Sequence, residues 1–147
     1  MDAEAYDRWH ETPCGRWIGK REAALILEGL QPRPGESLLD VGCGTGFFAR
    51  TLAAAMDGNV VGVDINSEWV EYARRRDVGR ATYAVADARA LSYADASFDS
   101  VVSIAAICFI PEEVAAIREI VRVARRRFAI GLLNRHSLLW WQKATRF

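Results

Sequence analysis

The sequence predicts an α/β fold, a doubly wound, mainly parallel sheet with helices on both faces. Three observations support this prediction. Short apolar, β-branched runs alternate with longer amphipathic runs, which is the pattern of parallel strands joined by crossover helices. Closely spaced glycines follow the first of these apolar runs, at residues 42–46. The chain has 147 residues, of which 51% are hydrophobic, so one domain can bury a full core.

The expected strands are five short apolar runs, and the expected helices are the amphipathic runs around them. Strands are predicted at Ser37–Val41, Val60–Asp64, Ala81–Ala86, Ser97–Ile104 and Phe128–Leu133. Helices are predicted at Trp17–Leu30, at Gly46–Met56, from an N-cap at Ser67 through Arg75, and from Pro111 with an apolar face of Val114, Ile117, Val121 and Ala124. The arginine runs 74–76 and 125–127 are expected at helix ends, where cations suit the helix dipole.

The charge balance and the cysteine content exclude several classes of protein. Nineteen Lys and Arg residues balance nineteen Asp and Glu residues, so no net field attracts nucleic acid or an anionic membrane. The three cysteines are widely spaced without a CxxC pair, which supports neither a disulfide framework nor a zinc site. The N-terminus is charged, and no apolar run reaches the ~18 residues of a membrane span. We therefore expect a cytoplasmic protein without a metal, a nucleic-acid partner or a membrane segment.

The glycines after the first strand predict a ligand-binding turn. A strand that ends at Val41 and a helix that begins near Gly46 place this turn at the carboxyl edge of the sheet, where open α/β sheets bind ligands. Gly42 and Gly44 permit positive φ and leave space for a ligand, and Gly46 lets the helix pack close to the strand. An ordinary tight turn is the alternative.

Acidic residues near this turn favour one class of ligand. Residues 44–49 (GTGFFA) fit the G-x-G-x-x-A fingerprint of dinucleotide sites, and Asp64 suits the ribose of either NAD or an adenosyl cofactor. Asp40 would repel a pyrophosphate but complement the ammonium and sulfonium charges of S-adenosylmethionine; a structural role in its own turn stays open. Asp87 suits the exocyclic amine of adenine, or is a simple turn residue, and Ala88 offers a backbone N–H to a ring nitrogen.

Four segments resemble, in order, the motifs of class I S-adenosylmethionine-dependent methyltransferases of the small-molecule type: LLDVGCGTGFFA, VVGVDIN, YAVADARAL and FDSVVSIAAICFI. The resemblance implies a Rossmann-like fold, S-adenosylmethionine as methyl donor, S-adenosylhomocysteine as product and a small-molecule acceptor. It implies that the methionine end of the cofactor is held by Asp40, Gly42, Gly44 and Gly46. It further implies that Asp64 binds the ribose, that Ile65 and Ala88 flank the adenine and that Asp87 binds its amine.

The same resemblance sets expectations for the ends of the chain. We expect a single domain over residues 1–147, with residues 1–30 as a helical lead-in or lid and residues 35–135 as the cofactor-binding core. The family often has a Pro-Gly-Gly turn before its fifth strand and two strands after it, and the sequence shows neither pattern. Because an uncovered edge strand is an aggregation hazard, a truncated form of a longer protein is favoured over a dimer that covers the edge. A monomer or a weak homodimer is expected.

The N-terminal segment YDRWHETPCGRW lies where related enzymes fold a lid over the cofactor. Tyr6, Trp9 and Arg16 are the candidate lid residues, with Tyr6 and Arg16 as candidate cofactor ligands; for Trp9, packing against the helices of the sheet is the alternative. The candidate general bases are His10, Glu11, Tyr6 and His136. None of them lies in a recognisable catalytic constellation, so the catalytic residues are not assigned.

A methyltransferase acting on a small molecule is the leading interpretation. The segment IAAICFIPE after the fourth strand lacks the Asn- or Asp-Pro-Pro-aromatic pattern of the family's nucleic-acid amino-methylating enzymes, which disfavours a base-modifying enzyme. A non-catalytic cofactor-binding or scaffold domain is second, because no base is recognised and the last strands are missing. An NAD(P)-dependent oxidoreductase is third.

Overall fold

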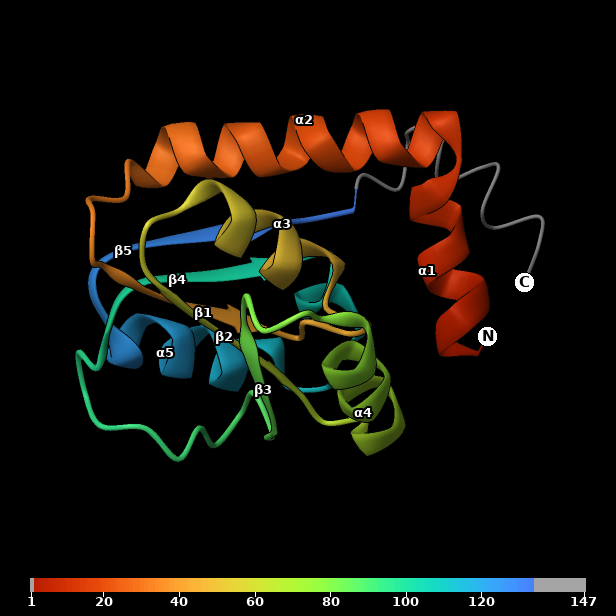
Figure 1. Cartoon of the computed structure of the whole chain (residues 1–147). Coiled ribbons are helices and arrows are strands. Elements are labelled where there is room, and N and C mark those ends of the chain that lie inside the picture. The colour runs from red at the N-terminus through yellow and green to blue at the C-terminus, as the bar shows by residue number, and fades with distance from the viewer. Residues whose placement is uncertain (1, 134–147) are drawn as a thin grey trace.

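The protein contains a five-stranded, all-parallel sheet in the order β3-β2-β1-β4-β5, as a computed structural model of residues 2–133 shows (Figure 1). The helices are α1 (Ala3–Glu11), α2 (Pro13–Leu30), α3 (Phe47–Ala55), α4 (Ser67–Arg76), the short 3-10 helix η1 (Ile107–Phe109) and α5 (Glu113–Val123). The strands are β1 (Ser37–Val41), β2 (Asn59–Asp64), β3 (Thr82–Val85), β4 (Phe98–Ile104) and β5 (Ala124–Gly131). The predicted doubly wound α/β fold is confirmed.

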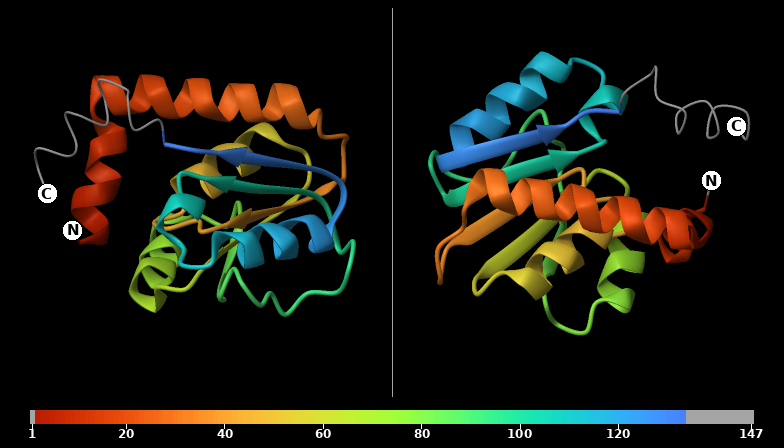
Figure 2. Two further views of the ribbon diagram at one scale, coloured as in Figure 1. Left: turned by 180° about the vertical axis from the view of Figure 1, so that it is seen from behind. Right: turned by 90° about the horizontal axis from the view of Figure 1, so that it is seen from above.

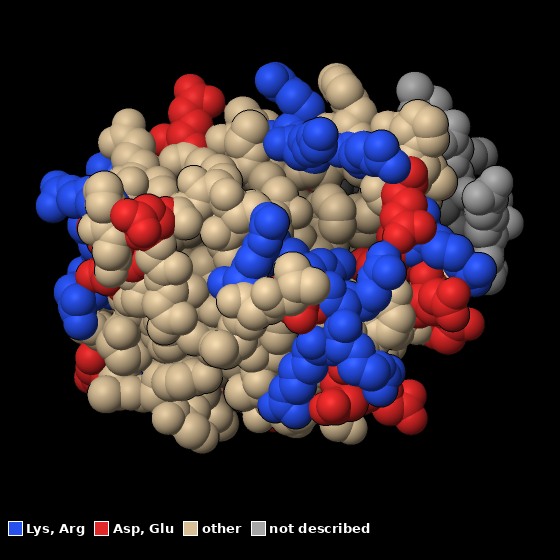
Figure 3. Space-filling view, viewed as in Figure 1, with Lys and Arg blue, Asp and Glu red and all other residues tan. Residues whose placement is uncertain are grey.

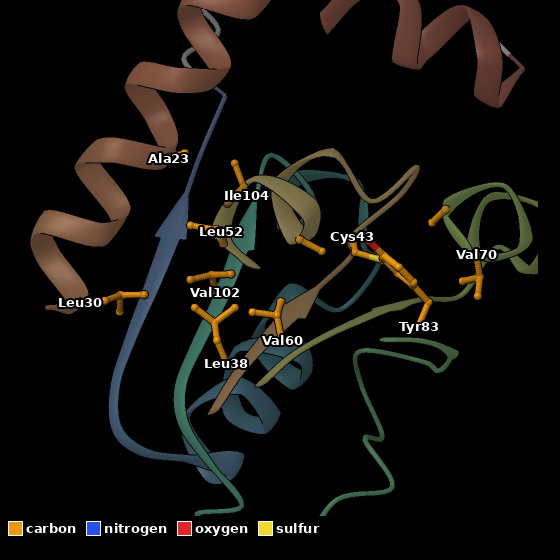
Figure 4. Packing of buried hydrophobic residues seen from close by; sticks show 12 residues of the cluster. Ala23, Leu30, Leu38, Cys43, Leu52, Val60, Val70, Tyr83, Val102 and Ile104 are labelled. Atoms are coloured by element: carbon orange, nitrogen blue, oxygen red, sulfur yellow. The ribbon is translucent and has the colours of Figure 1, made fainter. Parts of the chain in front are cut away.

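Helices cover both faces of the sheet (Figure 2). Side chains of α2, α3 and α4, among them Leu30, Leu52 and Val70, share one buried cluster with the sheet (Figure 4). Side chains of α5 share a second cluster with the opposite face, together with the loop between β3 and β4. The sheet is therefore shielded from water on both faces, as parallel sheets usually are.

The central strand β1 carries the side chains that separate these two layers. Leu38 faces the cluster of α2 and α3, and Leu39 and Val41 face the cluster of α5, which is the two-residue alternation of a strand. β1 pairs with β2 on one side and with β4 on the other. Because the strands are parallel, the carboxyl ends of β1, β2 and β4 meet at one edge of the sheet.

The N-terminal residues form two helices rather than the single lead-in predicted from Trp17. Thr12 accepts from the backbone N–H of Gly15 as the N-cap of α2, and Pro13 occupies the first turn of that helix. A Cβ at Gly15 would collide with the carbonyl oxygen of Trp9, so the tight corner between α1 and α2 needs glycine. α1 consequently turns away from α2 and lies beside the carboxyl ends of the strands (Figures 1 and 2).

The predicted start of the fifth strand was wrong. β5 begins at Ala124, directly after α5, so the arginines 125–127 are strand residues and not the end of a helix. As strand residues they find acidic partners on neighbouring segments, since Arg125 pairs with Asp99 at 2.8 Å and Arg126 with Glu36 at 2.6 Å. The arginines of α4, by contrast, lie in its last turn as predicted.

Two details of the helices also differ from prediction. The N-cap of α4 is Asn66 and not Ser67, because the Asn66 side chain accepts from two N–H groups of the first turn. On α5 the buried stripe is Ala116, Ile120 and Val123, whereas Val114 and Val121 are 56% and 47% exposed. Both stripes of α5 are apolar, so periodicity alone could not select the one that packs on the sheet.

Within residues 2–133, no helix is both long and apolar enough to cross a membrane. The same residues contain no group of three or more His, Cys, Asp or Glu side chains arranged to hold a metal ion. The candidate base His136 lies outside the described residues.

Candidate functional site

A cavity of about 630 Å³ opens at the carboxyl edge of the sheet. Its floor is the glycine turn between β1 and α3, residues 42–45, and its sides come from segments that follow β2, β3 and β4. Helix α1 contributes Tyr6 and His10 to the wall opposite the sheet. The cavity therefore lies where the sequence predicts a ligand, at the point where β1 separates the two directions of winding.

The glycines of the turn have three different roles. Gly42 has φ +76°, and a Cβ there would collide with the Cβ of Ala106 beyond β4. Gly44 has φ +54°, and a Cβ added there would lie 3.2 Å from the ring of Trp69. Gly46, at φ +77°, packs beneath Tyr83 and Ala73. Gly42 and Gly44 line the cavity, while Gly46 allows α3 to approach the sheet.

Asp64 at the end of β2 stabilises the conformation of the glycine turn through hydrogen bonds. One carboxylate oxygen accepts from the backbone N–H of Gly44 at 2.8 Å, and the other accepts from the N–H of Asn66 at 2.9 Å. Each carboxylate oxygen has a second lone pair, so Asp64 can still accept from a ligand hydroxyl on the cavity side. Ile65, the next residue, is largely exposed at the cavity mouth.

Asp40 lies under the turn with an unsatisfied acceptor. The residue is 1% exposed, and its Oδ2 atom has no hydrogen-bond partner among the described residues. Burial and the nearby Asp64 carboxylate raise the pKa of Asp40 to about 7. A buried acceptor without a donor is rare and costs free energy, and a cationic ligand in the cavity would supply both a donor and a counter-charge. The residues at this end of the cavity therefore fit a ligand that carries an ammonium or sulfonium group.

Asp87 lies at the far end of the cavity, after β3, with a partner that the sequence did not reveal. Its carboxylate receives hydrogen bonds from the Arg89 guanidinium, at 2.7 Å and 3.0 Å, and from the Arg89 backbone N–H. These hydrogen bonds hold the pKa of Asp87 at about 2. Asp87 is thus a fixed carboxylate acceptor, and the neighbouring Ala88 is buried beside it in the cavity wall.

The segment after β4 forms a mainly apolar wall. Ala105 has φ +54°, a conformation that is uncommon for a residue with a Cβ, and its N–H donates to the carbonyl of Gly131. Ala106, Phe109 and Ile110 follow it along the cavity. Phe109 is 74% exposed, which places a large aromatic side chain at the mouth.

Helix α1 brings aromatic side chains to the opposite wall. Tyr6 packs against Trp69 with ring centroids 5.2 Å apart, and His10 stacks on Phe47 at 3.8 Å. Burial raises the pKa of Tyr6, so its hydroxyl stays protonated at neutral pH. The structure does not bring Arg16 to this cavity: its guanidinium donates to the Glu11 carbonyl and lines a smaller hollow of about 280 Å³.

Several residues of the site were not predicted from the sequence. Trp69 lies in the first turn of α4, outside the four segments that resemble the family, and Arg89 lies within the segment YAVADARAL but was given no role. Asp7, also missed, is a buried carboxylate on α1 that contacts the glycine turn. Its neighbours in sequence are mixed aromatic and charged residues, which gave no signal that this carboxylate is buried.

Charged side chains of both signs are interspersed on the face of the molecule in Figure 3, which includes the region around α4. Many of the arginines there are paired, such as Arg74 with Glu71 and Arg76 with Glu11.

Comparison with known proteins identifies related chains. Residues 39–127, more than half of the chain, match a family model described as a methyltransferase domain. An O-methyltransferase of Pyrenophora dematioidea is 36% identical over 111 residues, which cover 72% of this chain and 42% of the relative. The 27-O-demethylrifamycin SV methyltransferase of Amycolatopsis mediterranei is 41% identical over 113 residues, 71% of this chain and 42% of that protein. The chain thus spans about two fifths of the length of these relatives.

Solved structures share the fold. The PH0226 protein of Pyrococcus horikoshii superposes with a TM-score of 0.80 and 28% identity, covering 93% of this chain and 62% of that one. The [4+2]-cyclase SpnF superposes with a TM-score of 0.66 and 33% identity, covering 71% of this chain and 40% of the cyclase. One fold therefore serves methyltransferases and a cyclase among the proteins similar to this chain.

Proposed function

The chain belongs to the class I S-adenosylmethionine-dependent methyltransferase family, and from that membership we propose that it binds S-adenosylmethionine in the cavity at the carboxyl edge and transfers its methyl group to a small, uncharged acceptor. The observation that carries the proposal is Asp40, a buried carboxylate whose Oδ2 atom is without a hydrogen-bond partner among the described residues. A cofactor with an ammonium and a sulfonium group complements it, whereas a pyrophosphate would be repelled.

Different residues around the cavity would bind different parts of the cofactor. Asp40, Gly42 and Gly44 would hold the methionine end, Asp64 would accept from the ribose, and the segment at Asp87 and Ala88 would receive the adenine. The bound cofactor supplies an electrophilic methyl group. Methyl transfer needs alignment of this group with the acceptor and exclusion of water more than it needs a protein nucleophile. The aromatic wall of α1 excludes water on the side facing solvent.

The wall after β4 supports the proposed class of acceptor. Alanine, phenylalanine, isoleucine and proline side chains line it between residues 105 and 111. Arg89, the basic side chain beside the adenine end, is already paired with Asp87 at 2.7 Å and with Glu112 at 3.7 Å. A charged acceptor would lose its hydration without gaining a partner on this wall, which supports a small, neutral acceptor rather than nucleic acid. The proposal includes a cytoplasmic monomer or weak homodimer.

A second candidate function has its own support. The likeness to a [4+2]-cyclase is compatible with a domain that uses this cavity for a reaction other than methyl transfer, or that binds the cofactor without turning it over. An NAD(P)-dependent oxidoreductase is a weaker candidate because of the carboxylate at Asp40.

Calorimetry tests which cofactor the cavity binds and which class of acceptor it prefers. We expect S-adenosylhomocysteine to bind with a stoichiometry near one and NADH to give no heat. Into protein saturated with S-adenosylhomocysteine, 2-naphthol should then bind about tenfold more tightly than 6-hydroxynaphthalene-2-sulfonate, because the sulfonate must give up its hydration. Binding of NADH alone would overturn the proposal. Preference for the sulfonate would overturn the acceptor class and leave the cofactor assignment standing.

The affinity for S-adenosylhomocysteine should rise with pH through the neutral range. Asp40 has a folded-state pKa of about 7, above the ordinary 3.8, and the cationic end of the ligand binds the ionised form. The expected gain is about tenfold between pH 6 and pH 8, measured by calorimetry.

The ligand-free protein should show the opposite trend. It holds an extra proton between about pH 4 and 7, so the contribution of Asp40 to stability falls as pH rises through that window. In Asp40→Asn both dependences should flatten, which also controls for titration of the ligand amine. An unchanged pH profile in this variant would mean that another group titrates.

A further inference from the structure

One buried carboxylate, that of Asp7, connects helix α1 to several parts of the core. Asp7 is 2% exposed. It accepts from the Thr45 hydroxyl at 3.0 Å, from the Arg50 guanidinium at 3.0 Å and 3.3 Å, and from the Tyr72 hydroxyl at 3.4 Å. Arg76 completes the cluster at 3.4 Å. The donors come from the glycine turn, α3 and α4, so the carboxylate joins α1 to three separate parts of the core.

Asp7 is connected to the glycine turn in two ways, directly and through Arg50. The hydroxyl of Thr45, a residue 1% exposed, donates to Asp7 directly. Arg50 donates to the carboxylate of Asp7 and also to the carbonyl oxygen of Thr45, at 2.6 Å. Asp7, Arg50 and Thr45 thus form a closed ring of hydrogen bonds. The docked position of α1 and the conformation of the turn are each favoured by the other, because neither can change without breaking this ring.

The position of Asp7 on its helix gives the ring a consequence for the cavity. Tyr6 precedes Asp7, and His10 follows one turn later, and both side chains line the cavity. Beyond the Asp7 cluster, these two residues contact the core through aromatic rings, Tyr6 with Trp69 and His10 with Phe47. Such ring contacts add only modestly to the apolar area that they bury. The charge-assisted hydrogen bonds of Asp7 are therefore the main buried polar attachment of α1.

We propose that Asp7 is a positioning residue that couples docking of α1 to occupancy of the cofactor site, through the hydrogen-bonded ring with Arg50 and Thr45. This inference rests on the proposed function. A ligand held against Gly42 and Gly44 stabilises the turn, the stabilised turn favours the docked α1, and by reciprocity a docked α1 tightens ligand binding. Asp7 itself contacts Thr45 and the arginines, and acts on the ligand through them.

Hydrogen exchange and calorimetry on the whole chain test the coupling. In the wild type, S-adenosylhomocysteine should slow amide exchange in residues 3–11 by about tenfold. In Asp7→Asn, which keeps the size of the side chain but removes its charge, exchange in this helix should be fast with or without ligand, and ligand affinity should fall by about tenfold. The matched control is Glu4→Gln, which removes a charge from the exposed face of the same helix.

A second variant separates coupling from a purely structural role. Thr45→Val removes the donor on the turn, and we expect it to speed exchange in α1; combined with Asp7→Asn it should cause little further loss, because the two residues act through one ring. Loss of thermal stability in Asp7→Asn with unchanged ligand affinity and unchanged ligand-induced protection would overturn the coupling. Wild-type protein that binds no S-adenosylhomocysteine would overturn the proposed function instead, while faster α1 exchange in Thr45→Val would still support the link between turn and helix.

Discussion

Replacing Gly42 with alanine is expected to lower the free energy of unfolding by about 3 kcal/mol, the combined cost of a left-handed backbone and an overpacked contact. Gly42 has φ +76°, and the added methyl group would collide with the Cβ of Ala106. Ala106 is short and close to its backbone, so the clash cannot be relieved by a change of rotamer. Either the turn or the segment after β4 must shift. Urea denaturation of the purified protein measures the loss.

The chain offers a matched control for this substitution. Gly79 has φ +84°, and a Cβ there would meet nothing within 4 Å, so Gly79→Ala has the backbone cost without the collision. Its expected loss is about 1 kcal/mol. Adding Ala106→Gly to Gly42→Ala should recover most of the difference between the two single variants. Equal losses in Gly42→Ala and Gly79→Ala would show that the contact with Ala106 is not tight.

Because the same shift deforms the cavity floor, Gly42→Ala should also lose most of its affinity for S-adenosylhomocysteine. Gly79→Ala, far from the cavity lining, should bind normally. The cofactor assignment and the packing argument are thus tested on the same pair of proteins.

Replacing Asp64 with alanine is expected to weaken binding of S-adenosylhomocysteine by about 1–3 kcal/mol, roughly 5- to 150-fold, as charge-assisted hydrogen bonds are lost. The side chain has two roles, since it accepts from the backbone of Gly44 and Asn66 and faces the proposed ribose position. Loss of the hydrogen bonds to the turn and loss of the acceptor for the ribose both weaken ligand binding. Calorimetry gives the affinity, and circular dichroism checks that the fold survives.

Two companion variants sharpen this measurement. Asp57→Ala removes an exposed carboxylate after α3, outside the cavity lining, and should leave the affinity unchanged. Asp64→Asn keeps one acceptor oxygen and should fall between the wild type and the alanine variant. An affinity for Asp64→Ala equal to that of Asp57→Ala would remove Asp64 from the binding site.

The parts of the fold that the sequence predicted are those in which local and global signals agree. β1 is short, apolar and followed at once by glycine, and its bounds are as predicted. The start of β5 was missed because ARRR looks like the end of a helix until Asp99 and Glu36 are known to lie beside it. Ion-pair partners that are distant in the sequence decided that boundary.

In the candidate site, too, the residues placed by the strands could be predicted, and those placed by the docking of α1 could not. The cavity brings together Asp40, Gly42, Gly44 and Asp64 because all four follow, or end, adjacent parallel strands. The burial of Asp7 could not be predicted, since it depends on the corner between α1 and α2 near Gly15 and on where α1 then packs. Arg16 was predicted to bind the cofactor because of its position in the sequence, but its side chain lines a separate, smaller hollow beside Glu11.

The two sides of the cavity are encoded in different stretches of the chain. The proposed donor side comes from residues 40–88, from β1 to the loop after β3, while the proposed acceptor side comes from residues 105–111 after β4. Substitutions in residues 105–111 therefore change the proposed acceptor wall without altering the proposed donor-binding residues. This separation suits directed evolution of acceptor preference: residues 105–111 can be randomised while residues 40–88 are kept constant.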